Sequence, residues 1–120
     1  MLIEIKEIHS LTPDDFIPFI EKWNVFTKKL NPYLIGMDKV ESGDYNTFKM
    51  TGRAPWPVAG RIMFATTYPM INYAKDEHIL IVTDRGLEKI FDKYLSADDK
   101  KNYVLGRMRF GGYWFTPNKD

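Results

Sequence analysis

The stretch Ala54-Pro55-Trp56-Pro57-Val58-Ala59-Gly60-Arg61, followed by the apolar run Ile62-Met63-Phe64-Ala65, decides how this chain is expected to fold. Two prolines flank the tryptophan, so the segment can form neither the interior of a helix nor a central strand. The residue before each proline is restricted to extended backbone. We therefore expect a stiff elbow between two strands, with the Trp56 indole closing one end of a core or cavity.

The length and the charge balance of the chain restrict its class. Its 120 residues predict a single domain over 1–120. Seventeen basic and sixteen acidic residues give a net charge of +1, which disfavours nucleic acid as a partner. The sequence contains no cysteine and shows no signal peptide, so we expect a cytoplasmic protein without disulfides.

Before the elbow, the pattern predicts strand, helix, strand, strand. Near-alternation of apolar and charged residues indicates a strand over 2–9. Thr12, Pro13 and two acids form a typical helix start, and apolar residues continue at helical spacing to residue 30. Pro18 should kink this helix or loosen its first turn. Strands are then expected over 33–41 and 45–51, joined by a turn.

After the elbow, a long strand is expected over 61–73, with Pro69 indicating a free edge or a bulge. A shorter strand over 78–83 follows. Asp84 can cap a second helix over 87–95, and residues 96–101 are expected to form a charged loop. A last strand is expected over 103–115, bent at Gly111-Gly112. This order predicts an α+β fold in which a curved antiparallel sheet of about six strands packs on two helices.

Two segments resemble START (StAR-related lipid-transfer) domains of the helix-grip, Bet v 1-like superfamily. One is the Pro55-Trp56-Pro57 elbow with Arg61, and the other is the final strand, from Gly106 to Pro117. The resemblance implies a sheet that grips a helix around a lipid cavity. It also implies that the lid helix found at the C-terminus of such domains is missing here. The chain would then be a fragment, a reduced version, or a domain whose cover comes from a second copy.

Residues that could carry catalysis or bind a metal are few. His9 and His78 have no partner at metal-ligand spacing, so neither a metal site nor a cofactor is expected. The acid pairs Asp14-Asp15 and Asp98-Asp99 fit a helix start and a solvated turn better than acid–base chemistry. The pairs Lys28-Lys29 and Lys100-Lys101 could touch anionic headgroups transiently, although ordinary solvated surface is favoured.

Three arginines have two interpretations. Arg107 and Arg109 share one face of the expected last strand, and the outward, solvated orientation is favoured because arginine is rarely buried. Pointing inward, either would need a carboxylate or an anionic ligand as partner. For Arg61, the START resemblance favours a structural ion pair.

The leading hypothesis is binding or transfer of a lipid or another apolar small molecule in a hydrophobic cavity, without catalysis. A second is an interaction module that uses an open apolar sheet face, which predicts a homodimer. A third, by fold analogy, is a helix-grip enzyme of cyclase or hydrolase type. The candidate ligand-binding residues are Trp56, Arg61, Met63, Phe64, Tyr68, Arg107, Met108, Arg109, Phe110 and Trp114.

Overall fold

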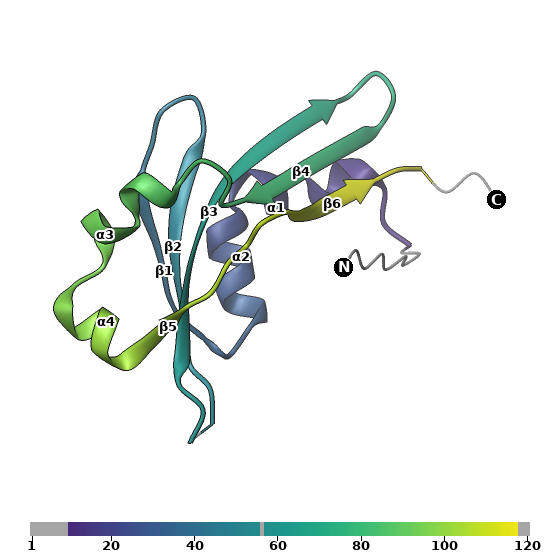
Figure 1. Cartoon of the computed structure of the whole chain (residues 1–120). Coiled ribbons are helices and arrows are strands. Elements are labelled where there is room, and N and C mark those ends of the chain that lie inside the picture. The colour runs from purple at the N-terminus through teal and green to yellow at the C-terminus, as the bar shows by residue number, and fades with distance from the viewer. Residues whose placement is uncertain (1–9, 56, 118–120) are drawn as a thin grey trace.

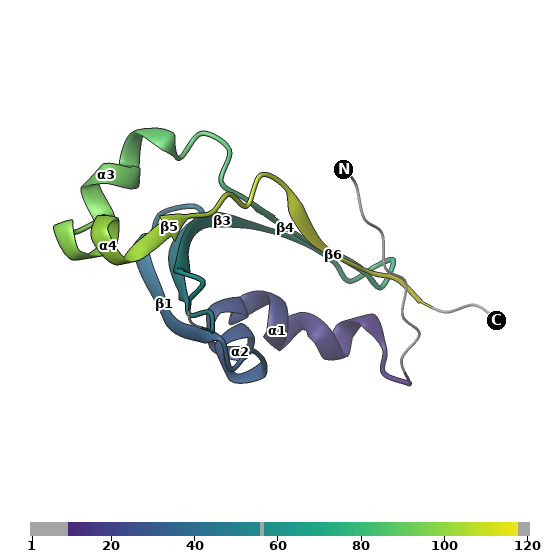
Figure 2. The ribbon, with the colours of Figure 1, turned by 60° about the horizontal axis from the view of Figure 1, so that its bottom comes forward.

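The computed structural model describes residues 10–55 and 57–117. Within them the chain forms the predicted α+β fold: a curved, unclosed sheet of six strands with short helices on both of its sides (Figure 1, Figure 2). The strand predicted over 2–9 and the Trp56 side chain lie outside the described residues.

The first helical layer consists of three short pieces instead of one helix. They are the 3-10 turn η1 (Pro13–Phe16), α1 (Ile17–Glu21) and α2 (Trp23–Leu30). A capping box starts η1, where the Asp15 carboxylate accepts the Thr12 backbone N–H at 2.7 Å. The loosened first turn expected from Pro18 is present as η1. A second break at Lys22 (φ −119°, ψ 42°) was not predicted.

Four strands follow as antiparallel neighbours, and each agrees with its predicted range to within one residue. They are β1 (Leu34–Glu41), β2 (Asn46–Gly52), β3 (Gly60–Asn72) and β4 (Glu77–Thr83). The pairing of β3 with β2 ends at Thr67, so Pro69 lies where that edge of β3 is free.

Alternate residues of β3 serve two different cores, because successive side chains of a strand point to opposite faces. On one face, Met63 and Ala65 pack beneath α1 and α2 in the main core. On the other face, Ile62 and Phe64 belong to a second, smaller core. The buried residues of the main core are Ile20, Trp23, Met37, Phe48, Met50, Ala65, Leu80 and Val82.

The second helical layer covers the smaller core. It comprises the 3-10 turn η2 (Glu88–Ile90), α3 (Phe91–Tyr94) and α4 (Ala97–Asn102). The Phe91 ring stacks on Phe64 with centroids 5.0 Å apart. Lys49 Nζ, on β2, donates to the Tyr94 carbonyl oxygen at 2.8 Å and to Asp99 Oδ2 at 2.7 Å, which ties this layer to the sheet.

The prediction of a charged loop over 96–101 was wrong, because this segment is α4. Ser96 caps the helix: its side chain accepts the Asp99 N–H at 3.0 Å, and the Asp99 carboxylate accepts the Ser96 N–H at 3.0 Å. This capping box is a local helix-start signal that the charge run concealed. In place of the single helix predicted over 87–95, the structure has the 3-10 turn η2 and the short helix α3, which ends at Tyr94.

The single last strand predicted over 103–115 was also wrong. Instead, β5 (Tyr103–Leu105) pairs in parallel with the start of β3, and β6 (Gly111–Phe115) pairs antiparallel with β4. The reason is that β4 ends at Thr83, opposite Thr66. After β5 the chain leaves the edge of β3. It then passes around the end of β4 and pairs, as β6, with the edge of β4 that faces away from β3.

Candidate interaction surface

The predicted cavity residues do not line one cavity. Phe64 is 0% exposed and faces α3, whereas its neighbour Met63 packs on the opposite face against the main core. Met108 also packs against the main core, although it lies in the crossing between β5 and β6. Phe110, in the same crossing, is exposed.

The three arginines lie in different environments. Arg61 and Arg109 are exposed and make no ion pair among the described residues. Arg107 lies in a structural ion-pair network: its Nε donates to Asp84 Oδ2 at 2.7 Å, and its Nη2 donates to Glu88 Oε1 at 2.8 Å. Both Arg107 and Arg109 are exposed, as favoured, but the ion pairs of Arg107 with two carboxylates were not predicted.

Tyr68 and Trp114, the remaining predicted residues, lie on one continuous apolar surface. Trp114 is directly opposite Ile79, and Tyr68 is directly opposite Ile81. We call this surface the open sheet face, and it lies on the same side of the sheet as α3 and α4. Its residues are Tyr45, Tyr68, Met70, Ile79, Ile81 and Trp114.

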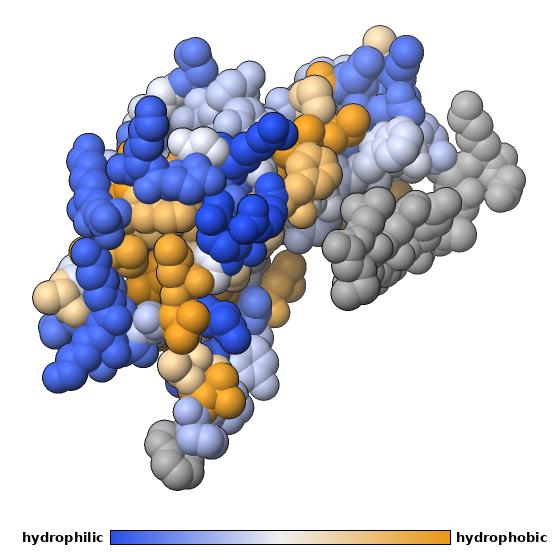
Figure 3. Space-filling view, viewed as in Figure 1, coloured by the Kyte–Doolittle hydropathy of each residue, from blue (hydrophilic) through white to orange (hydrophobic). Residues whose placement is uncertain are grey.

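The open sheet face is exposed because the second helical layer ends before it. Phe91 covers the half of β3 around Phe64, and nothing described covers the half beyond Thr66. Trp114 is 69% exposed, Tyr45 is 51% exposed and Met70 is 49% exposed. Figure 3 shows apolar side chains gathered over β3 and β4 on this face.

Gly112 leaves a gap in the surface beside Ile81, its partner in the register. Its backbone has φ +156°, and a Cβ there would overlap the Leu80 carbonyl oxygen. The close approach of β6 to β4 therefore requires glycine at this position.

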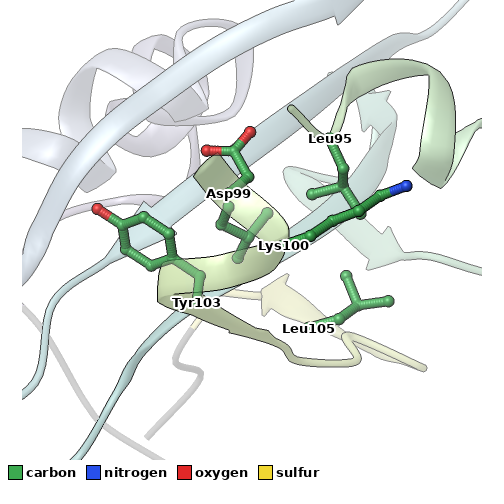
Figure 4. Close-up of a pocket in the computed structure, with 6 residues that line it drawn as sticks. Leu95, Asp99, Lys100, Tyr103 and Leu105 are labelled. Carbon is green, nitrogen blue, oxygen red and sulfur yellow. The ribbon is translucent and has the colours of Figure 1, made fainter. Parts of the chain in front are cut away.

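Two hollows lie elsewhere in the molecule. One, of about 200 Å³, is formed beside α4 and β5 (Figure 4). A shallower groove of about 500 Å³ runs between α2 and β1, with Val25 and Met37 among its lining residues and Lys28 and Lys29 beside them. The residues that line the first hollow are Ile62, Leu95, Asp99, Lys100, Tyr103 and Leu105.

A cluster of titratable groups that the sequence analysis missed joins η1 to β4. His78 is fully buried, and its Nε2 lies 2.7 Å from Asp14 Oδ1 and 3.9 Å from Asp76 Oδ1. Burial raises the pKa of the Asp76 carboxyl above its ordinary value, and the adjacent Asp14 carboxylate raises it further. Because 64 residues separate Asp14 from His78, no local spacing could have revealed this contact.

This cluster does not fit a metal site as it stands. The Asn72 N–H donates to His78 Nδ1 at 3.2 Å, so the neutral ring carries its proton on Nε2 and donates it to Asp14. A metal on Nε2 would move that proton to Nδ1, where it would face the Asn72 N–H. Metal-bound histidines normally donate their second N–H to an acceptor, which is lacking here. The cluster instead anchors η1 to the sheet.

One sequence signal could have located the open sheet face. The run His78-Ile79-Leu80-Ile81-Val82 is apolar at almost every position, a pattern typical of a strand that is covered on both faces. In the structure Leu80 and Val82 are buried in the main core, whereas Ile79 and Ile81 are only half-buried. The two apolar residues that the main core does not use, Ile79 and Ile81, therefore lie on the open sheet face.

Comparison with known proteins gives no relative: no protein-family model, curated protein or solved structure matches the chain. Among the described helices, none has the length and apolar character needed to cross a membrane.

Proposed function

We propose that the domain is a self-association module that pairs with a second copy of this chain through the open sheet face. The observation that carries the proposal is the continuous row of exposed and half-buried aromatic and aliphatic side chains across β3, β4 and β6. Glu77 lies at the end of this row, on the same face of β4 as Ile79, and no charged residue lies within it. Two copies can therefore bring it together without burying or opposing charges, and their net charge of +1 opposes association only weakly.

The size of the surface fits a weak, concentration-dependent dimer. Taking about 200 Å² for a fully exposed large side chain, the six residues expose roughly 400 Å². Patches of about this size on a monomer are often functional. Two such faces would bury roughly 800 Å² in total, which is below the range of stable complexes and fits only a weak, transient one.

Sedimentation of the purified chain over a concentration series tests the proposal. We expect a reversible monomer–dimer equilibrium, and at least about tenfold weaker association for Trp114→Ser, because the most exposed aromatic of the face is lost. Trp114 is so exposed that this change should leave folding intact. Leu30→Ser is the matched control, since Leu30 is 76% exposed and ends α2, which lies on the opposite side of the sheet from the open sheet face. A wild-type chain that stays monomeric up to about 1 mM contradicts the proposal.

A second candidate function is binding of a lipid or another apolar small molecule, which the START resemblance implies. It is favoured by the groove of about 500 Å³ between α2 and β1, since the expected cavity was also between helix and sheet. Mass spectrometry of the natively purified chain and titration with a fluorescent fatty acid test this candidate. A cytoplasmic location is part of both proposals.

A further inference from the structure

Three separate segments meet at one end of the molecule: the last turn of α2, the connection to β1, and the loop that follows β2. The Arg53 N–H donates to the Tyr33 carbonyl oxygen at 2.9 Å, which joins the loop to the connection. The connection is itself fixed, because the Tyr33 N–H donates to Asn31 Oδ1 at 3.0 Å. Figure 1 shows the connection and the loop projecting at the same end of the sheet.

This end exposes large apolar side chains. Leu30 is 76% exposed, Tyr33 is 60% exposed and Val58 is 56% exposed. They project from three different elements at the extremity of the molecule and are not part of the open sheet face.

Cations without partners surround these apolar groups. Lys28, Lys29 and Arg53 are exposed and form no ion pair with any described residue. By contrast, Lys49, Lys100 and Arg107 each contact a carboxylate. The acids Asp14, Asp15, Asp76 and Glu77 lie at the other end, in η1 and at the turn between β3 and β4. Although Lys75 lies in the same turn, this end keeps an excess of acids, so the small net charge hides a separation of charge along the molecule.

We propose that this basic tip, defined as Lys28, Lys29, Leu30, Tyr33, Arg53 and Val58, docks on an anionic membrane surface. Lysine and arginine attract acidic lipid headgroups. Tyrosine prefers the boundary between headgroups and acyl chains, and protruding aliphatic side chains gain from shallow burial there. The acidic opposite end would orient the domain with its tip toward the bilayer.

Charge and shape together favour a membrane over a nucleic acid. Binding along a phosphate backbone requires many cations in a stripe. The few at this end, Lys28, Lys29, Arg53 and the neighbouring Arg61, are instead interleaved with protruding aliphatic side chains. A single transient membrane contact needs only a few cations combined with apolar insertion.

Co-sedimentation with vesicles tests the proposal. We expect binding to phosphatidylcholine vesicles that contain about 30% phosphatidylserine, little binding to pure phosphatidylcholine, and weakening as salt rises from about 0.05 M to about 0.3 M. Lys28→Gln/Lys29→Gln should bind at least about tenfold more weakly. Lys75→Gln/Lys89→Gln makes the same change in net charge away from the tip and should bind like the wild type.

A second pair of variants tests the apolar part and separates this proposal from self-association. Leu30→Ser/Tyr33→Ser should lose vesicle binding and keep the monomer–dimer equilibrium, whereas Trp114→Ser should do the reverse. Circular dichroism checks that each variant is folded. The proposal is overturned if the wild type does not bind the anionic vesicles, if both lysine double variants bind equally, or if binding is lost with Trp114 instead of Leu30 and Tyr33.

Discussion

Asp84 directly follows β4. It is 1% exposed, and its carboxylate accepts three hydrogen bonds. Arg107 Nε and the Met108 backbone N–H donate to Oδ2 at 2.7 and 3.0 Å, and Arg107 Nη2 donates to Oδ1 at 3.3 Å. The Asp84 N–H in turn donates to the Met108 carbonyl oxygen at 2.7 Å. The crossing from β5 to β6 is therefore fastened to the end of β4 by Asp84, and the Thr83 hydroxyl also donates to the Arg109 carbonyl oxygen.

Replacing Arg107 should show how much its contact with Asp84 contributes to the free energy of unfolding. We expect Arg107→Gln to lower the free energy of unfolding by about 2–3 kcal/mol, because a buried carboxylate loses its charged partner while part of the arginine was already solvated. Arg109→Gln, two residues away and exposed, should change it by less than about 0.5 kcal/mol. Urea denaturation measures both. Equal effects of the two substitutions would contradict this role of Arg107.

The same carboxylate makes stability depend on acid. Burial alone would raise the pKa of Asp84, but the Arg107 guanidinium and the Met108 N–H outweigh burial and hold the pKa below its ordinary value. A depressed pKa stabilises the fold above the unfolded-state pKa of about 4, and this stabilisation is lost as the pH falls through the folded-state value. Thermal unfolding should therefore show a smaller loss between about pH 6 and about pH 3 in Arg107→Gln than in the wild type. An unchanged pH dependence would contradict this.

Residue-level prediction worked where the signal was local. Thr12 was predicted as a helix cap and does cap η1. Asp84, the other predicted cap, does not cap a helix: the cap of η2 is Leu87, and the Asp84 carboxylate accepts from Arg107 and Met108 instead. The bond between Asp84 and Arg107 was not predicted, because the two residues are 23 positions apart in the sequence and meet only where β4 ends. Likewise Tyr68 and Trp114 were selected as binding residues, whereas Ile79 and Ile81 were missed because only the register shows which face they occupy.

At the scale of elements, β1 to β4 could be predicted because adjacent strands are joined by turns with clear local signals. The C-terminal third could not, because its path depends on the edge of β3 that β4 leaves unpaired. The alternation around Met108 was read as part of a continuous strand, yet the segment between β5 and β6 is not a strand and is held by single bonds to Ile62, Thr83 and Asp84.

The pairing of β6 with β4 should be disrupted by a single methyl group added at Gly112. We expect Gly112→Ala to destabilise the fold by about 2 kcal/mol or more, because the backbone at φ +156° is strained for alanine and the Cβ would overlap the Leu80 carbonyl oxygen. Gly43→Ala is the control, since a Cβ there meets nothing within 4 Å. Urea denaturation with hydrogen exchange at β4 amides measures the effect. A neutral Gly112→Ala would show that β6 does not approach β4 this closely.

The whole molecule is elongated. On one side the main core includes residues of β1 to β4 and β6, whereas on the other side helices cover only the half of the sheet around Phe64. The radius of gyration of the molecule is 15.8 Å and its extents are 51 × 33 × 27 Å. An ordinary compact domain of this length would have a radius of gyration of about 13.6 Å. A curved sheet was predictable from the glycines and prolines in its strands, but the offset between its two helical layers was not, because it depends on α4 and β5.

Small-angle scattering should detect this shape in solution. We expect Trp114→Ser at low concentration to keep an elongated profile, with a radius of gyration well above that of a compact domain of equal length. The wild type should give a larger value as concentration rises, since the paired form adds a second body. A compact profile for the variant would show that the uncovered half of the sheet closes in solution.

The shared edge of β3 also limits how the length of this chain can change during evolution. Ile62 is the last residue beside β5 and Thr66 the first beside β4, so two strands occupy one edge in tandem with three residues between them. Lengthening either strand there would displace the other. Insertions and deletions among descendants of this sequence should accordingly accumulate in the turn at residues 42–45 and be selected against at residues 83–85 and 105–106.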